Sequence, residues 1–108
     1  MRSGSMFSRT PILRAFLTSS TTGTPIVPAQ AGRIIRVLSA STVVDLAVSV
    51  SFGSNVTAIT SAKPLAANGG FVLPFEERGW FETNVGEALT LILSSPVTTA
   101  IDITYEVE

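Results

Sequence analysis

A strict alternation of apolar and polar side chains runs through residues 43–52. The apolar side chains on one side are Val44, Leu46, Val48, Val50 and Phe52, and the residues between them are mostly small or polar. A period of two is that of a β-strand with one buried face, and this block predicts a strand about 30 Å long. No segment of the sequence shows a convincing period of 3.6 residues, so we expect no long helix.

Shorter blocks of the same kind predict the rest of the fold. They are residues 12–18, 33–39, 56–61, 71–75, 87–94 and 101–107, with turn signals at 40–42, 53–55, 66–70, 76–79 and 95–96. Residues 11–17 also admit a short helix. In the last block we expect Ile101, Ile103, Tyr105 and Val107 to face inward and Asp102, Thr104 and Glu106 to face outward. The sequence predicts an all-β fold, an antiparallel β-sandwich or jelly roll of about seven or eight strands.

The block at residues 33–39 is apolar on both of its faces. Ile34 and Leu38 share one side, while Ile35 and Val37 share the other. A strand that is apolar on both faces is usually covered on both. In a small sandwich that cover can be a neighbouring subunit, so Ile35 and Val37 are candidate interface residues. The alternative cover is the amino-terminal segment.

Composition removes the commonest catalytic and metal-binding groups. The chain has no Cys and no His, so it has no thiolate ligand, no disulfide and no imidazole base. Lys63 is the only lysine and has no catalytic signature around it. The acids Glu76, Glu77, Glu82 and Glu87 are compatible with an acid–base pair acting on a sugar or with a Ca²⁺ site. We interpret them as a solvated acidic rim and expect no enzyme, cofactor or metal.

Charge is divided unevenly along the chain. Residues 1–36 carry five arginines and no acid, whereas residues 37–108 carry two basic side chains and eight acids, which gives charges of +5 and −6. We expect residues 1–32 to form an extended amino-terminal arm and residues 33–108 to form the β-sandwich domain. Arg2, Arg9 and Arg14 suit docking of that arm on an acidic surface such as a neighbouring copy, and the alternative is chance placement of solvated charges.

The sequence gives no sign of a nucleic-acid or membrane partner. The arginines are spread out rather than clustered, so we expect no nucleic-acid binding. No apolar run approaches the ~18 residues of a membrane-spanning helix. Residues 29–31 resemble a signal-peptide cleavage site, but no continuous apolar run precedes them, so we expect no signal peptide. Charged residues make up 14% of the chain against an average of about 25%, so we expect part of its surface to be covered by partners.

Residues 68–81 combine turn-forming and aromatic residues. Asn68 and Gly69 predict left-handed backbone, and Gly70 predicts a close approach of two backbones. The aromatic candidates for a contact surface are Phe71, Trp80 and Phe81. We expect a contact between subunits there, and a sugar ring stacked on Trp80 is the alternative.

Three stretches in the second half of the chain form a recognisable pattern. Residues 64–75 read Pro-Leu-Ala-Ala-Asn-Gly-Gly-Phe-Val-Leu-Pro-Phe, and Gly79-Trp80-Phe81-Glu82-Thr83 and Gly86-Glu87-Ala88-Leu89-Thr90-Leu91 follow. These stretches resemble small virion proteins of tailed bacteriophages, over about the last 75 residues and without residues 1–32. The resemblance implies a capsid decoration (cement) protein, which is a β-sandwich, often a trimer, on the icosahedral shell.

Three hypotheses follow for the function. By the resemblance, the first is a structural virion protein on the outer capsid surface, with the major capsid protein and copies of itself as partners. The second is a tail or fibre β-sandwich module that binds a host receptor or glycan through Trp80. The third is a hydrolase that acts through the acids at residues 76–87.

Overall fold

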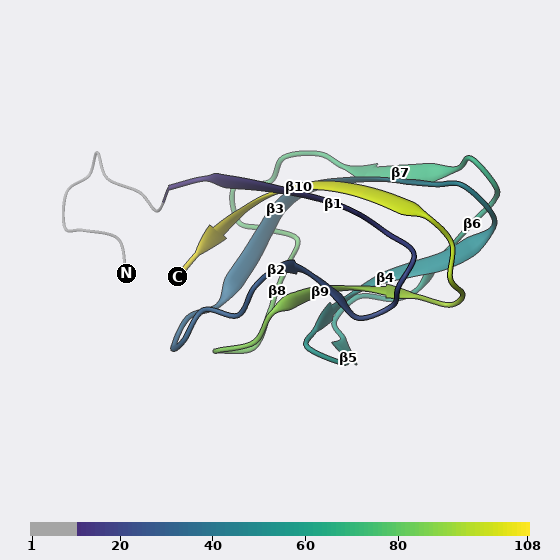
Figure 1. The fold of residues 1–108 in the computed structure, drawn as a ribbon. Helices are drawn as coiled ribbons and strands as arrows, with labels where there is room; N and C mark the ends of the chain where they lie inside the picture. The colour runs from purple at the N-terminus through teal and green to yellow at the C-terminus, as the bar shows by residue number, and fades with distance from the viewer. Residues whose placement is uncertain (1–10) are drawn as a thin grey trace.

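The computed structural model describes residues 11–108, which form ten strands and no helix. The strands are β1 (Leu13–Ser19), β2 (Thr24–Val27), β3 (Ile35–Val44), β4 (Val48–Ser54), β5 (Thr57–Ala58), β6 (Lys63–Leu65), β7 (Gly70–Leu73), β8 (Phe81–Glu82), β9 (Leu89–Leu93) and β10 (Thr99–Val107). Sheet A has the order β1-β10-β3-β7, with β8 also on β3, and sheet B has the order β2-β9-β4-β5, with β6 also on β4. They form the upper and lower layers of Figure 1. The predicted all-β fold, two packed antiparallel sheets, is confirmed.

The core lies between the two sheets and is formed by the inward side chains of both. It comprises Ile26, Val27, Ile35, Val37, Ala40, Val44, Val48, Val50, Phe52, Leu89, Leu91, Leu93, Val97, Ile101 and Ile103. Full burial of one Val, Leu, Ile or Phe side chain stabilises the fold by about 1.5–3 kcal/mol. Ile35 and Val37 are completely buried within this single chain, so the expectation that they contact a partner is wrong.

The turn that follows β3 lies later in the chain than the sequence predicts. Strand β3 continues through residues 40–42, the predicted turn, because Ala40 and Thr42 face inward and pair with β10 and β7. The chain turns instead at residues 45–47, where the Asp45 N–H donates to the Thr98 carbonyl at 3.0 Å. Leu46 lies in this turn and is 59% exposed. Since Val44 and Val48 are both inward, the alternation hides the turn between them.

Residues 13–27 belong to the sandwich. The predicted strand at residues 12–18 is found as β1, which pairs with β10 from Leu13 opposite Tyr105 to Ser19 opposite Thr99. Strand β2 pairs with β9 at the edge of sheet B. The expected boundary of an arm at residue 32 therefore does not hold for this segment. The alternation explains the difference, because it gives β1 an inward apolar side that packs on the core through Ala15 and Leu17. The predicted contact residues Arg2 and Arg9 lie outside the described residues.

The last strand keeps its predicted alternation, and Tyr105 packs against the core. Ile101 and Ile103 face inward and Asp102 outward, as predicted. The register of β10 against β3 shifts between Thr104 and Tyr105, which is a β-bulge or similar irregularity. Thr104 lies opposite Ser39 and Tyr105 opposite Val37, so the extra residue is Leu38 of β3, and the alternation of β3 rather than that of β10 inverts there. Glu106 lies opposite Arg36 on the outward side of this strand, as predicted, but it is fully buried there, with its carboxylate 3.3 Å from the Arg36 guanidinium.

Candidate interaction surfaces

The outer face of sheet A carries exposed apolar side chains. The register places Phe16 of β1 opposite Asp102 of β10. Asp102 lies opposite Ser41 of β3, and Ser41 lies opposite Val72 of β7. Phe16 is 80% exposed and Val72 is 70% exposed, so this row across the sheet begins and ends on an apolar side chain in solvent. Val43 of β3 is also exposed.

A shallow groove of about 270 Å³ lies on this face. Its lining includes Arg14, Ser39, Phe75 and Thr104. The hydroxyl oxygens of Ser39 and Thr104 are 2.6 Å apart and form a hydrogen bond. Arg14 and Asp102 also line the groove beside Val72 and Phe75, so it offers a partner charged as well as apolar contacts.

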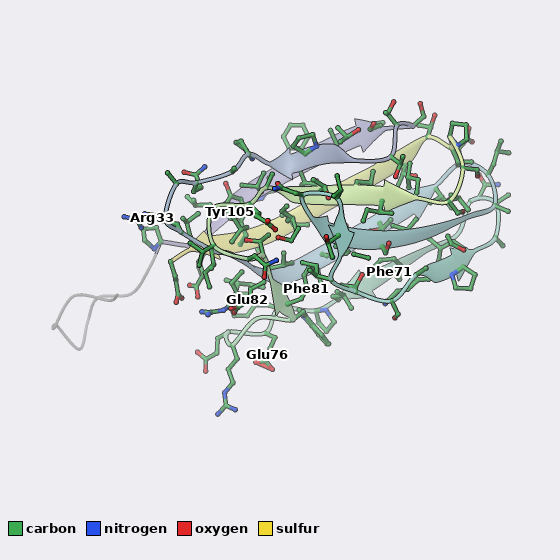
Figure 2. All side chains as sticks on the ribbon, turned by 90° about the horizontal axis from the view of Figure 1, so that it is seen from below. Arg33, Phe71, Glu76, Phe81, Glu82 and Tyr105 are labelled. Carbon is green, nitrogen blue, oxygen red and sulfur yellow. The ribbon has the colours of Figure 1, made fainter. Side chains whose placement is uncertain are left out.

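A pocket of about 270 Å³ opens where the edges of the two sheets approach each other. It is lined by Phe52, Thr60, Ser61, Lys63, Leu73, Trp80 and Phe81. The rings of Phe52 and Phe81 are 4.9 Å apart between centroids, and they join the pocket wall to the core. Figure 2 shows Phe71 and Phe81 along one margin of the sandwich, with Glu76 on a loop that projects beyond it.

Lys63 supplies the charged side chain of this pocket. Its ammonium lies 3.3 Å from the Ser61 carbonyl and 3.4 Å from the Ser61 hydroxyl. The same nitrogen is 5.9 Å from the centre of the Phe71 ring, which is within the range of a cation–π contact. The pocket thus combines aromatic walls with a cation, and Phe71 supports it from outside.

The loop at residues 74–80 is fixed against β3 by backbone hydrogen bonds. The Glu76 N–H donates to the Leu38 carbonyl at 2.9 Å, and the Trp80 N–H donates to the Val37 carbonyl at 2.8 Å. The Trp80 indole N–H donates to the Pro74 carbonyl at 2.8 Å. Trp80 is 46% exposed, so one side of its ring faces solvent while its polar edge is satisfied.

Arg36 sits beneath this loop and binds three carboxylates. Its guanidinium nitrogens lie 3.0 Å from Glu82, 3.3 Å from Glu106 and 2.6 Å from Glu108. Burial opposes the charged guanidinium, but hydrogen bonds and charges from Glu82, Glu108 and Glu106 outweigh it, so the pKa of Arg36 is raised. Gly79 passes directly over the side chain, since a Cβ there would lie 2.3 Å from the Arg36 Cγ.

The acids of residues 76–87 do not form one site. Glu82 binds Arg36, as described above, whereas Glu87 accepts a hydrogen bond of 2.5 Å from Ser54. The side-chain amide of Asn84 also donates to Glu87, at 3.2 Å. Within residues 11–108 no group of three or more Asp or Glu side chains is placed to hold a metal ion. Glu82 and Glu87 thus each bind side chains of a different part of the chain, Glu82 to Arg36 and Glu87 to Ser54 and Asn84.

The predicted contact residues divide between the two surfaces. Trp80 and Phe81 line the pocket, Phe71 lies beside it, and Arg14 lines the groove on sheet A. Sequence reasoning did not select Phe16 or Val72, although the alternation of their strands places each on a definite side. Only the pairing of β1 with β10 and of β7 with β3 shows that those sides face solvent.

The chain matches no protein-family model, no curated protein and no solved structure. In the part of the chain that the structure describes, no helix is long and apolar enough to cross a membrane.

Proposed function

We propose that the protein is a structural virion protein that binds the outer shell of the major capsid protein and stabilises the head. The observation that carries the proposal is the outer face of sheet A, where Phe16, Val43, Val72 and Phe75 are all more than half exposed. Exposed apolar side chains gathered on one face are typical of a protein–protein contact. The resemblance of residues 64–91 to phage decoration proteins points to the same role.

The order of the strands supports the proposal. If β5 and β6 count as one strand, and β7 and β8 as another, each sheet has four strands in the orders 1-10-3-7/8 and 2-9-4-5/6. We interpret this order as that of a jelly roll, an architecture of viral capsid and lectin domains. Architecture alone does not assign a function. The choice between a capsid domain and a lectin domain therefore rests on the exposed face of sheet A.

Binding to the shell is tested by cosedimentation with heads assembled from the major capsid protein of the same virus. The variant Val43→Ser/Val72→Ser removes two apolar side chains from the outer face of sheet A. We expect it to reduce the bound fraction at least about tenfold, since loss of interface apolar area weakens binding. The matched control is Val56→Ser, which changes a side chain that is 91% exposed in the β4–β5 turn. Equal binding of both variants and the wild type, or no binding at all, contradicts the proposal.

The pocket at Trp80 favours a second candidate, a tail or fibre module that binds a host receptor or glycan. Half-exposed Trp80 offers a ring face for stacking on a sugar, and Lys63 offers a donor beside it. Glycan-array binding is the test, with Trp80→Ala expected to abolish a signal that Trp80→Phe retains in part. If Trp80→Ala unfolds the domain instead, the residue is part of the core and this candidate fails. Absence of any wild-type signal contradicts it as well.

A further inference from the structure

Three of the four outer edges of the two sheets are protected against pairing with another strand. At one edge of sheet B, β2 has four residues, contains Pro25 and has a register shift. At the other edge, β5 has two residues and β6 has three, among them Lys63 and Pro64. At one edge of sheet A, β7 has four residues and is followed by Pro74, and β8 has two. Short length, proline, lysine and bulges are the usual devices that prevent edge-to-edge association.

Strand β1, at the remaining edge, has none of these devices, and its one charged side chain is Arg14. It runs for seven residues without Gly or Pro, and its register with β10 is unbroken from Leu13 to Ser19. No other strand of residues 11–108 pairs with its outer edge. Phe16 in its centre is 80% exposed and Leu13 at its start is 42% exposed. A long, regular, apolar edge is a template for another strand.

We propose that β1 pairs with β1 of a second copy of this chain, antiparallel and around a two-fold axis at Phe16. Phe16 is the central residue of Leu13–Ser19, so a symmetric register places Phe16 opposite Phe16 of the second copy. Leu13 then faces Ser19, and Arg14 faces Thr18. The two sheets A join along this edge into one continuous sheet with a common outer face.

The sequence of β1 is complementary to itself in this register. Directly opposed aromatic side chains stabilise an antiparallel pair, and Phe16 is 80% exposed on this face. Arg14 is the only charged residue of the strand, and the register sets it against a threonine rather than against the same arginine. On the inward side Ala15 faces Leu17, which extends the core across the junction. A contact of this kind is isologous and closes at two copies, unlike the three-fold ring that the resemblance implies.

A single cysteine at residue 16 tests the register. The natural chain has no Cys, so a disulfide in Phe16→Cys can form only between two copies. We expect oxidation, or a short thiol–thiol cross-linker, to convert most of this variant to a covalent dimer at micromolar protein. The matched control Val72→Cys, exposed on the opposite edge of the same face, should stay largely monomeric under denaturing electrophoresis. Equal cross-linking of the two variants, or none in Phe16→Cys, overturns the proposal.

The mass of the protein in solution provides the second measurement. Light scattering should give a dimer for the wild type, and Phe16→Lys should raise the dissociation constant at least about tenfold, because it opposes two like charges. A monomer at all concentrations, or a trimer that Phe16→Lys leaves intact, overturns the proposal. Both measurements use the isolated protein, so their failure leaves capsid binding through Val43 and Val72 standing. Failure of cosedimentation likewise leaves the pairing standing.

Discussion

The two edges of sheet A are organised in different ways. At the β7–β8 edge the chain is held by close backbone contacts: Gly70 lies against the Thr42 carbonyl, and the 74–80 loop donates two hydrogen bonds to β3. Beneath that loop Arg36 binds Glu82, Glu106 and Glu108. At the β1 edge a regular strand is paired on one side only among the described residues. The first edge is specified by individual residues, whereas the second is specified only by the alternation of its side chains.

At the β7–β8 edge the stability of the fold depends on individual residues, whereas at the β1 edge it does not. Substitutions of the residues that make these contacts at the β7–β8 edge, such as Gly70 and Arg36, should therefore change the free energy of unfolding. Substitutions on the exposed side of β1 should change association between copies and leave the single chain as stable as before. Five measurements test that separation.

The largest loss of stability is expected for Gly70→Ala. A Cβ at residue 70 would lie 1.9 Å from the Thr42 carbonyl oxygen, which belongs to the backbone and cannot turn away. We expect a loss of about 3 kcal/mol in the free energy of unfolding, measured by urea denaturation, because β7 has to separate from β3. Val72→Ala in the same strand is the control and should cost under about 0.5 kcal/mol. Wild-type stability in Gly70→Ala would contradict the close approach.

Arg36→Met should have the next largest effect. The change removes the guanidinium that binds the fully buried Glu106 but keeps most of the apolar stem. We expect a loss of about 2 kcal/mol, since Arg36 itself is partly exposed and its pairs are screened. Glu82→Gln, at a carboxylate that is 49% exposed, should cost under about 1 kcal/mol. Equal losses for Arg36→Met and Glu82→Gln would show that the burial of Glu106 does not add to the free energy of unfolding.

The raised pKa of Arg36 predicts how this contribution depends on pH. A group with a raised folded-state pKa contributes stability fully below its unfolded-state pKa and loses it as pH rises through the folded-state value. For an arginine that window lies in strongly alkaline solution. Comparison of the wild type and Arg36→Met between pH 6 and pH 9 should therefore show no pH dependence that comes from the titration of Arg36 itself.

Thr42→Val should stabilise the protein. Thr42 is 1% exposed, and its hydroxyl oxygen has no hydrogen-bond partner among the described residues. Valine has nearly the same shape without the hydroxyl, so the cost of burying an unpaired polar group disappears. We expect a gain of about 1 kcal/mol in urea denaturation. The matched control is Thr99→Val, because the Thr99 hydroxyl donates to the Val97 carbonyl at 3.0 Å, and that change should destabilise the protein.

The smallest effect on the single chain is expected for Phe16→Ser. The side chain is 80% exposed and contributes little to the core of its own copy. The free energy of unfolding, measured at dilutions where copies are separate, should stay within about 0.5 kcal/mol of the wild type. A loss above about 2 kcal/mol would place Phe16 in the fold of the single chain and remove the contrast between the two edges.

The alternation in the sequence predicted the class of fold because a period of two is imposed by the backbone itself. The alternation failed to predict a turn and a bulge, because neither is marked by a break in the pattern of apolar and polar residues. Val44 and Val48 both face inward on either side of the turn at residues 45–47, so an unbroken strand gives the same pattern. Val37 and Ala40 both face inward because Leu38 is an extra residue of β3 relative to β10, and the sequence alone shows this segment only as apolar on both faces. Both features depend on pairing with distant strands.

The candidate contact residues were predictable only in part, for a related reason. Trp80 and Phe81 stood out by type, and the structure places both at the pocket. Ile35 and Val37 were indistinguishable by type from interface residues, since a core side chain and a contact side chain are chemically the same. Gly70 was predicted from its position in a turn, and the structure confirms the close approach. Phe16 required the register of β1, which depends on residues about 90 positions away.

The pairing of β1 with β10 also affects how the chain reaches its native state. The first and last strands are neighbours, and Leu13 meets Tyr105. Contacts between distant residues close large loops, so folds of this type form in milliseconds to seconds rather than in microseconds. Synthesis at about 5–20 residues per second leaves β1 without its native partner until the final strand has been made. The nascent chain thus exposes an unpaired apolar segment during most of its synthesis, and chaperone demand and inclusion-body formation should depend on β1 more than on any other strand.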